Sequence, residues 1–128
     1  MRLLLDTHIF LWYITGDSRL PEAMQQDIRA ADNEVYLSVV SLWESVIKYH
    51  LGKLPLPEPP ETYLPLQRER HRIASLPLHE ASVSHLPNLP NLHRDPFDRI
   101  LICQAMVHNL TLMTVDESVR AYPVQLWS

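Results

Sequence analysis

The chain has 128 residues, of which 46% are hydrophobic, and its formal net charge at pH 7 is −4. This length and apolar content predict one folded domain over residues 1–128 and exclude a disordered chain. The negative balance argues against a strongly basic nucleic-acid-binding face, although bound divalent cations would offset part of it.

The predicted elements alternate between strand and helix along the chain. Short runs rich in apolar, β-branched and aromatic residues predict strands at residues 2–5, 34–40, 73–76, 110–114 and 124–127. The spacing of apolar residues predicts helices at residues 7–14, 22–31, 41–50, 61–71, 79–86, 96–108 and 117–121. This order predicts a mainly parallel sheet with helices on both faces.

Two of these helices carry specific expectations. Ser41 and Glu44 match a capping box at the start of the third helix, and Gly52 fits its end. Pro65 lies inside the fourth helix, where a proline costs ~3 kcal/mol. We therefore expect a break or a late start in that helix.

Four acids lie where predicted strands end or helices begin. Asp6 follows the first strand, Glu44 opens the helix after the second, and Asp116 follows the 110–114 strand by two residues. Asp98 lies in the first turn of the helix that precedes that last strand. Working sites in parallel α/β sheets lie beyond the carboxyl ends of the strands. We therefore expect these acids to meet at one edge of the sheet.

Each acid also has a structural explanation. Glu44 completes the capping box, and Asp116 suits a turn. Asp95 suits the cap position of the 96–108 helix, and Asp98 in its first turn favours the helix dipole. Asp6 is the hardest to explain in this way, because a carboxylate between an apolar strand and an apolar helix is expected to be buried and to need a partner.

The free energies of capping and of charge repulsion help to decide between a structural role and a metal site for these acids. Capping or dipole stabilisation is worth ~0.3–1 kcal/mol per acid. Two carboxylates ~5 Å apart repel by roughly 3 kcal/mol at an effective dielectric constant of about 20. Neither lysine, Lys48 or Lys53, is expected near these acids, so their convergence requires a bound cation or raised pKa values. Hard oxygen ligands select Mg²⁺ or Mn²⁺.

Four motifs together resemble those of the PIN-domain ribonucleases: LLLDTH, SLWE, HRDPFDR and LMTVD. In order and spacing they are similar, more narrowly, to the VapC-type toxins of bacterial toxin–antitoxin pairs. The resemblance implies a PIN-like α/β/α sandwich with a mainly parallel central sheet. It also implies an endoribonuclease that requires Mg²⁺ or Mn²⁺, forms a homodimer and is inhibited by a small antitoxin protein.

By the family's pattern, the catalytic and metal-binding quartet is Asp6, Glu44, Asp98 and Asp116. Thr7 and Thr114 match supporting polar positions beside it. Asp95 belongs to the HRDPFDR motif, but we rank it below Asp98 as a ligand because capping is sufficient to explain it. The reaction implied is metal-assisted hydrolysis of an RNA phosphodiester, in which the carboxylates hold metal.

Basic and aromatic residues near the quartet are weaker candidates for RNA contact. The favoured phosphate contacts are His93, Arg94 and Arg99. The basic run Arg68, Arg70, His71 and Arg72 is more typical of a solvated helix face than of an RNA groove. The aromatic residues Trp12, Tyr13 and Trp43 lie in apolar helical runs, where packing in the core or in a dimer is favoured over base stacking.

Cysteine usage and hydropathy bear on the compartment. The single cysteine, Cys103, excludes an intrachain disulfide, and we expect a cytoplasmic protein with this thiol in the core. No apolar stretch approaches the ~18 residues of a transmembrane span, and Asp6 and His8 interrupt what would be a signal peptide.

Two alternatives to an RNA-cutting enzyme remain open. One is a module that binds RNA or an antitoxin without cutting, which the intact acidic quartet argues against. The other is a PIN-like nuclease that cuts DNA, since a metal site alone does not distinguish the two sugars.

Overall fold

The computed structural model describes all residues, 1–128, around a four-stranded parallel sheet. The strands are β1 (Arg2–Leu5), β2 (Glu34–Ser38), β3 (Ala74–Leu76) and β4 (Thr111–Met113). They lie in the order β3-β2-β1-β4, so β1 is central, pairing Leu3 with Val35 on one side and with Thr111 on the other. The predicted parallel sheet is confirmed, and its strands point their carboxyl ends toward one edge.

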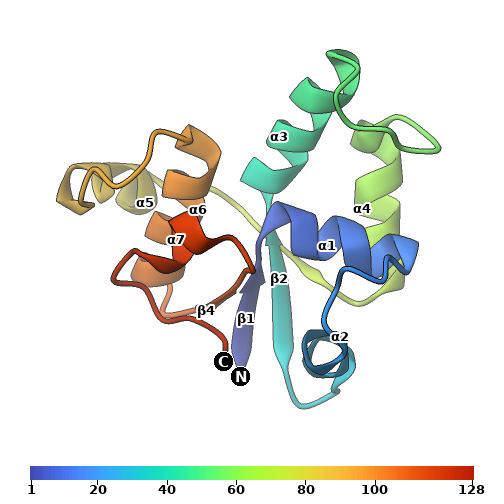
Figure 1. Cartoon of the computed structure of the whole chain (residues 1–128), viewed down its shortest axis with the longest axis horizontal. Helices are drawn as coiled ribbons and strands as arrows, with labels where there is room; N and C mark the ends of the chain where they lie inside the picture. Colours follow the sequence, from blue (N-terminus) through green and yellow to red (C-terminus); the bar gives the residue numbers. More distant parts are fainter.

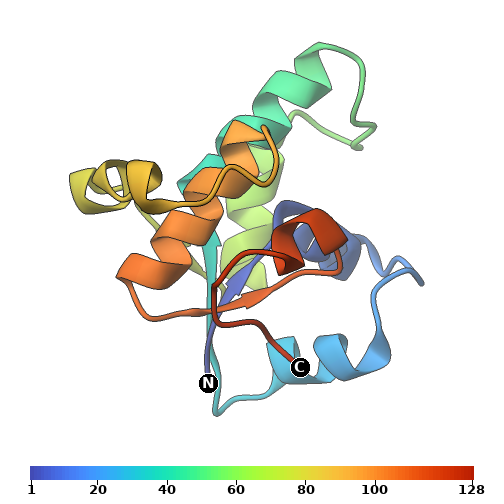
Figure 2. The ribbon, with the colours of Figure 1, turned by 60° about the vertical axis from the view of Figure 1, so that its left-hand side comes forward.

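Helices cover both faces of this sheet (Figures 1 and 2). One face carries α1 (Thr7–Thr15), α2 (Glu22–Arg29) and α4 (Pro60–Arg70). The other carries α5 (Glu80–Ser84), the 3-10 turn η1 (Leu86–Asn88), α6 (Pro96–Val107) and α7 (Glu117–Arg120). The remaining helix, α3 (Val39–His50), continues β2 beyond the sheet and packs against both α4 and α6. The expected α/β/α sandwich is confirmed.

The central strand divides the core into two layers. Leu3 and Leu5 point to the side of α1, α2 and α4, and Leu4 points to the side of α6; all three are fully buried. Cys103 is also fully buried on the α6 side, which confirms its expected place in the core. Strands buried on both faces explain why the first strand has an uninterrupted apolar run instead of an alternating one.

The start of α3 differs from the prediction. The strand expected to reach Val40 ends at Ser38, whose Oγ accepts a hydrogen bond from the Val40 N–H at 3.0 Å and so caps the helix. The capping box of Ser41 and Glu44 is therefore wrong, because both lie inside α3. The β-branched residues 39 and 40 favour a strand locally, but the serine cap and the burial of Val40 decide for a helix.

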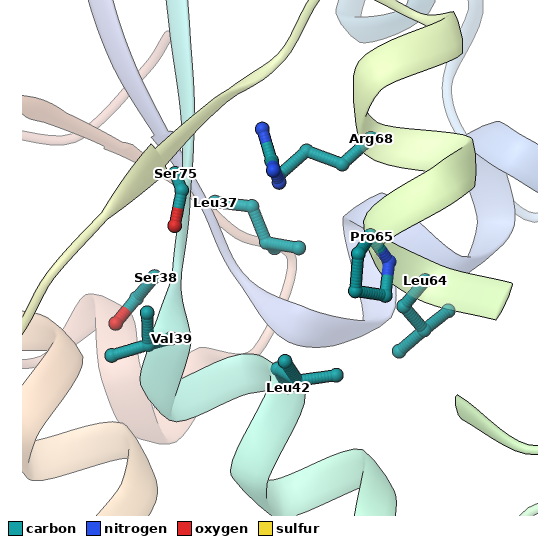
Figure 3. A pocket seen from close by; sticks show the side chains of 8 residues that line it. All are labelled: Leu37, Ser38, Val39, Leu42, Leu64, Pro65, Arg68 and Ser75. Atoms are coloured by element: carbon teal, nitrogen blue, oxygen red, sulfur yellow. The ribbon is translucent and has the colours of Figure 1, made fainter. Parts of the chain in front are cut away.

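The break expected at Pro65 is absent, and α4 runs through it. A proline there removes one backbone hydrogen bond, the one to the carbonyl of Glu61, and Glu61 is an exposed residue in the first turn of the helix. The helix also buries Leu64, which is 1% exposed. Figure 3 shows the Pro65 ring and Leu64 beside a small cavity of about 30 Å³ between β2, α3 and α4.

Two elements near the C-terminal half are shorter than predicted. The strand expected at 124–127 is reduced to one parallel bridge between Leu112 and Leu126. The helix expected at 79–86 is divided into α5 and η1, consistent with the restriction that Pro87 places on the residue before it. No helix of the structure has both the length and the apolar character needed to cross a membrane.

Candidate active site

Asp6 lies directly beyond the carboxyl end of β1 and is 7% exposed. Its Oδ1 accepts from the backbone N–H of Thr7 at 2.7 Å, which caps α1. Its Oδ2 accepts from the hydroxyl of Thr114, beyond the end of β4, at 2.6 Å. Burial raises the pKa of Asp6; the bonds from Thr114 and Thr7 oppose this shift, and the charge of Glu44 adds to it.

Glu44 reaches the same place from the second turn of α3 and is 3% exposed. Its Oε1 accepts from the hydroxyl of Thr7 at 2.8 Å, and the same hydroxyl lies 2.8 Å from the Oγ of Ser41. Since the carboxylate only accepts, Thr7 donates to Glu44 and Ser41 donates to Thr7. Thr7 therefore links the carboxylates of Asp6 and Glu44 through its N–H and its hydroxyl.

Lys48 forms an ion pair with Oε2 of Glu44, one turn along α3. Burial alone would lower the pKa of Lys48, but the bond to Glu44 and the charges of Asp95 and Asp98 together raise it. The expectation that neither lysine lies near the acids is wrong. The sequence signal was present, because residues four apart on a helix are neighbours.

Asp98 approaches from the first turn of α6. Burial raises its pKa to about 7, with further contributions from the charges of Asp6, Asp95 and Glu44, against a lowering by the bond to His93. Asp95 is the helix cap, and its Oδ1 accepts from the N–H of Phe97 at 2.9 Å, so its expected capping role is confirmed.

Asp116 lies apart from the other three quartet members in its interactions. It caps α7, and its exposed carboxylate accepts from the N–H of Ser118 at 2.9 Å and from its hydroxyl. Its charge is not among those that shift the pKa of Asp6 or Asp98. Its link to them is indirect, since the Asp116 N–H donates to the Thr114 hydroxyl that itself donates to Asp6. The structure thus brings Asp6, Glu44 and Asp98 together and leaves Asp116 at the rim.

The donor set of this site fits a hard divalent cation. All of its ligand atoms are carboxylate and hydroxyl oxygens, which suit Mg²⁺ or Mn²⁺ better than zinc. No three histidine, cysteine, aspartate or glutamate side chains are arranged to enclose an ion. Mg²⁺ typically binds proteins through one or two carboxylates and keeps several waters. Mutual repulsion among the acids is the condition that a cation relieves.

The three candidate phosphate contacts differ in their surroundings. His93 lies between Asp98, 3.2 Å from Oδ2, and the hydroxyl of Tyr122 at 2.8 Å. Arg99 also donates to the Tyr122 hydroxyl, at 2.8 Å. These two side chains therefore brace the start of α6, whereas Arg94 is exposed and has no hydrogen-bond or ion-pair partner.

The raised pKa of Asp98 predicts a pH-dependent stability in EDTA. Because the folded pKa of about 7 exceeds the ordinary 3.8, the stability from this group is full below pH 4 and is lost as the pH rises through 7. The Asp98→Asn variant stays neutral, so its melting temperature should exceed that of wild type by more at pH 7 than at pH 4. An equal difference at both pH values would contradict the burial of this charge.

Asp17→Asn is the matched control for that experiment. The hydrogen bond from the Arg19 side chain is the main cause that lowers the pKa of Asp17 to about 2. Its stabilising effect is therefore present above its ordinary pKa and lost as the pH falls toward 2. We expect Asp17→Asn to lower the melting temperature more at pH 7 than at pH 4, the reverse of Asp98→Asn.

The PIN domain family model matches residues 3–124. Ribonuclease VapC22 of Mycobacterium tuberculosis (strain ATCC 25618 / H37Rv) is 28% identical over 130 residues, which cover 98% of each chain. Ribonuclease VapC16 of the same strain is 41% identical over 63 residues, 49% of this chain. That match spans only 43% of VapC16, less than half its length.

Solved structures of low sequence identity share the fold. VapBC2 from Rickettsia felis, bound to a DNA fragment from its promoter, superposes with a TM-score of 0.73 at 18% identity, covering 100% of this chain and 98% of that chain. VapBC-1 from nontypeable Haemophilus influenzae gives 0.69 at 20% identity, with the same coverage. Because the family model extends over nearly the whole sheet and its helices, the chain belongs to the PIN domain family.

Proposed function

We propose that this chain is a metal-dependent endoribonuclease and the toxin of a toxin–antitoxin pair, acting on RNA phosphodiester bonds in the cytosol. The observation that carries the proposal is the gathering of Asp6, Glu44 and Asp98 from three separate elements at one edge of the sheet. The relatives VapC16 and VapC22, both named ribonucleases, support the same activity.

In this proposal the quartet Asp6, Glu44, Asp98 and Asp116 holds Mg²⁺ or Mn²⁺. Such an ion, when bound, supplies activation of water and neutralisation of charge on the phosphodiester. Thr7 and Thr114 hold the carboxylates of Asp6 and Glu44 in fixed directions through their hydroxyl groups. Asp116 contributes from the rim, where its exposed side chain has only Ser118 as a partner.

The side chains around the quartet have supporting roles in this proposal. Asp95 fixes the first turn of α6 and thereby the position of Asp98. Arg94, exposed and unpaired beside them, contacts a phosphate of the RNA. His93 and Arg99 meet the substrate at the same rim, held in place by Tyr122.

The protein partners in this proposal are a second copy of the chain and a small antitoxin. The outer side of α3 exposes an apolar row at four-residue spacing: Val39, Trp43, Ile47 and Leu51, between 37% and 63% exposed. We assign this row to the homodimer contact, because an apolar stripe on a helix buries against another element. In this proposal the antitoxin covers the acidic edge, as the family resemblance implies; the likeness to the VapBC structures supports the existence of such a partner.

The test of the proposed activity is cleavage of single-stranded and folded RNAs by the purified chain. Cleavage is expected with Mg²⁺ or Mn²⁺, to stop in EDTA and to return when the ion is restored. Equal turnover in EDTA would contradict the metal-dependent chemistry. Cutting of DNA but not RNA would favour the DNA-cutting alternative, and binding without cutting would favour the binding module.

A further inference from the structure

A polar cavity of about 370 Å³ lies at the edge of the sheet opposite the acids. Its walls come from the end of α1, the end of α2, the end of α4 and the start of β2, on the right-hand face in Figure 1. The polar side chains that line it are Tyr13, Arg29, Asn33, Arg70, His71 and Arg72. Arg29 and the 70–72 segment are about forty positions apart, so only the fold brings them together.

The charge of this cavity is opposite to that of the chain. Three arginines line it and no carboxylate does, although the net charge is −4. Arg29, Arg70 and Arg72 have no hydrogen-bond or ion-pair partner, whereas other arginines do, such as Arg19 with Asp17 at 2.7 Å. Exposed, unpaired guanidinium groups that face one hollow repel one another, and an anion relieves that repulsion.

The nearby acids do not neutralise these arginines. Glu34 pairs with Arg2 at 3.6 Å, and the carboxylate of Glu69 lies 3.9 Å from Arg68, whose side chain lines the small cavity shown in Figure 3. Asp32 precedes the rim residue Asn33 but does not line the cavity. The arginines are therefore available to a ligand.

Arg72 has a backbone conformation that is uncommon for its residue type. Its φ is +57°, in the left-handed region that follows a helix end, and the three other positions with positive φ hold Gly16, Gly52 and Asn109. Glycine and asparagine take this conformation at little cost, whereas a long side chain is strained in it. This conformation closes the end of α4, where the Ile73 N–H donates to the carbonyl of Arg68 at 2.9 Å.

We propose that this cavity binds a backbone phosphate of single-stranded RNA, as an anchor distant from the acidic edge; the assignment rests on the proposed ribonuclease function. Guanidinium forks match phosphate oxygens, and Tyr13 and His71, in edge contact with ring centroids 5.2 Å apart, add an aromatic surface. The cavity lies at the start of β2 and the acids lie beyond its other end, so an RNA chain that occupies both passes over the surface of the helices between them.

The test measures binding of a short fluorescein-labelled single-stranded RNA to the full chain in EDTA, by fluorescence anisotropy at several salt concentrations. Each phosphate contact adds about 0.7 to the slope of log K against log salt concentration. The triple variant Arg29→Gln, Arg70→Gln, Arg72→Gln, which removes the contact with that one phosphate, should therefore have a slope shallower by about 0.7. The single variant Arg70→Gln should also bind the RNA more weakly than wild type. Its matched control is Lys53→Gln, which removes one exposed charge elsewhere and should bind as wild type does.

Arg72→Gly separates binding from folding. It relieves the positive φ, so its melting temperature should rise while RNA binding weakens. Binding by the triple variant and by Arg70→Gln equal to that of wild type would overturn the proposal. Labelled RNA bound to the wild-type protein can be challenged with unlabelled RNA or with a glutamate-rich peptide. If the peptide displaces the labelled RNA as effectively as unlabelled RNA does, the assignment to RNA is overturned in favour of an acidic protein segment.

The same purified proteins distinguish a failure of the RNA anchor from a failure of the proposed ribonuclease function. Loss of binding in the triple variant supports the anchor whether or not wild type cuts RNA, because EDTA removes the chemistry from the measurement. Wild-type cleavage together with unchanged binding in the triple variant refutes the anchor alone.

Discussion

Asp6→Asn is expected to lower RNA cleavage at least about 100-fold while the protein stays folded. The substitution removes one negative charge from the centre of the site. The amide oxygen of asparagine can still accept from the N–H of Thr7, so the cap of α1 is kept. Since burial raises the pKa of Asp6, the neutral variant should melt at or above the wild-type temperature in EDTA.

Cleavage rates at saturating Mn²⁺, measured beside thermal melting, check this expectation. Asp17→Asn is the control, because it makes the same chemical change on a partly exposed aspartate, far from the quartet in the sequence, that pairs only with Arg19. Its cleavage rate should equal that of wild type. Wild-type cleavage by Asp6→Asn would exclude a metal-binding role for Asp6, and an unfolded variant would show that its charge is needed by the fold.

Lys48→Met is expected to destabilise the metal-free protein by about 1–3 kcal/mol. The lysine side chain is 37% exposed, but its partner Glu44 is 5% exposed, so the substitution leaves a buried carboxylate without its cation. Methionine keeps the length and much of the apolar stem of lysine, which limits the effect to the lost charge.

Thermal or urea unfolding in EDTA measures this difference, and Lys53→Met is the control. Lys53 is exposed and its side chain has no partner, so its replacement should change stability by less than about 0.5 kcal/mol. Adding Mn²⁺ should raise the melting temperature of Lys48→Met more than that of wild type, because the ion then neutralises Glu44 without competing with an ammonium group. Equal stability of the two variants would show that the ion pair contributes nothing.

Much of the fold follows from local sequence patterns. The run Leu3–Leu5 followed by Asp6 predicted a buried strand with an acid at its end, and both were found. Asp95 with Pro96 predicted the start of α6 to the residue. These features could be predicted because apolar periodicity and caps are local and their energies point the same way as the fold.

The start of α3 could not be fixed in the same way. Two serines, Ser38 and Ser41, lie three residues apart and both suit a helix cap, while the valines between them favour a strand. The choice depends on burial of Val40 against α6, which is a tertiary effect. The consequence reaches the site, because Glu44 then lies further along α3 and faces both Thr7 and Lys48.

The relation among the acids was predicted in part. The strand order places Asp6 at the sheet edge, and the packing of α6 brings Asp98 to it. The direction of the Asp116 side chain depends on how the chain turns into α7, and its own cap with Ser118 decides that. The basic cavity was beyond prediction, because it depends on the meeting of Arg29 with the end of α4.

Crystals soaked in Mn²⁺ test most directly whether the acids at this edge of the sheet hold a divalent ion. Anomalous scattering should locate an ion bound to the oxygens of Asp6 and Asp98, with Lys48 displaced from Glu44 or lying beside it. Manganese found only at other carboxylates, or no ordered manganese while Asp6 and Asp98 are well resolved, would contradict the claim.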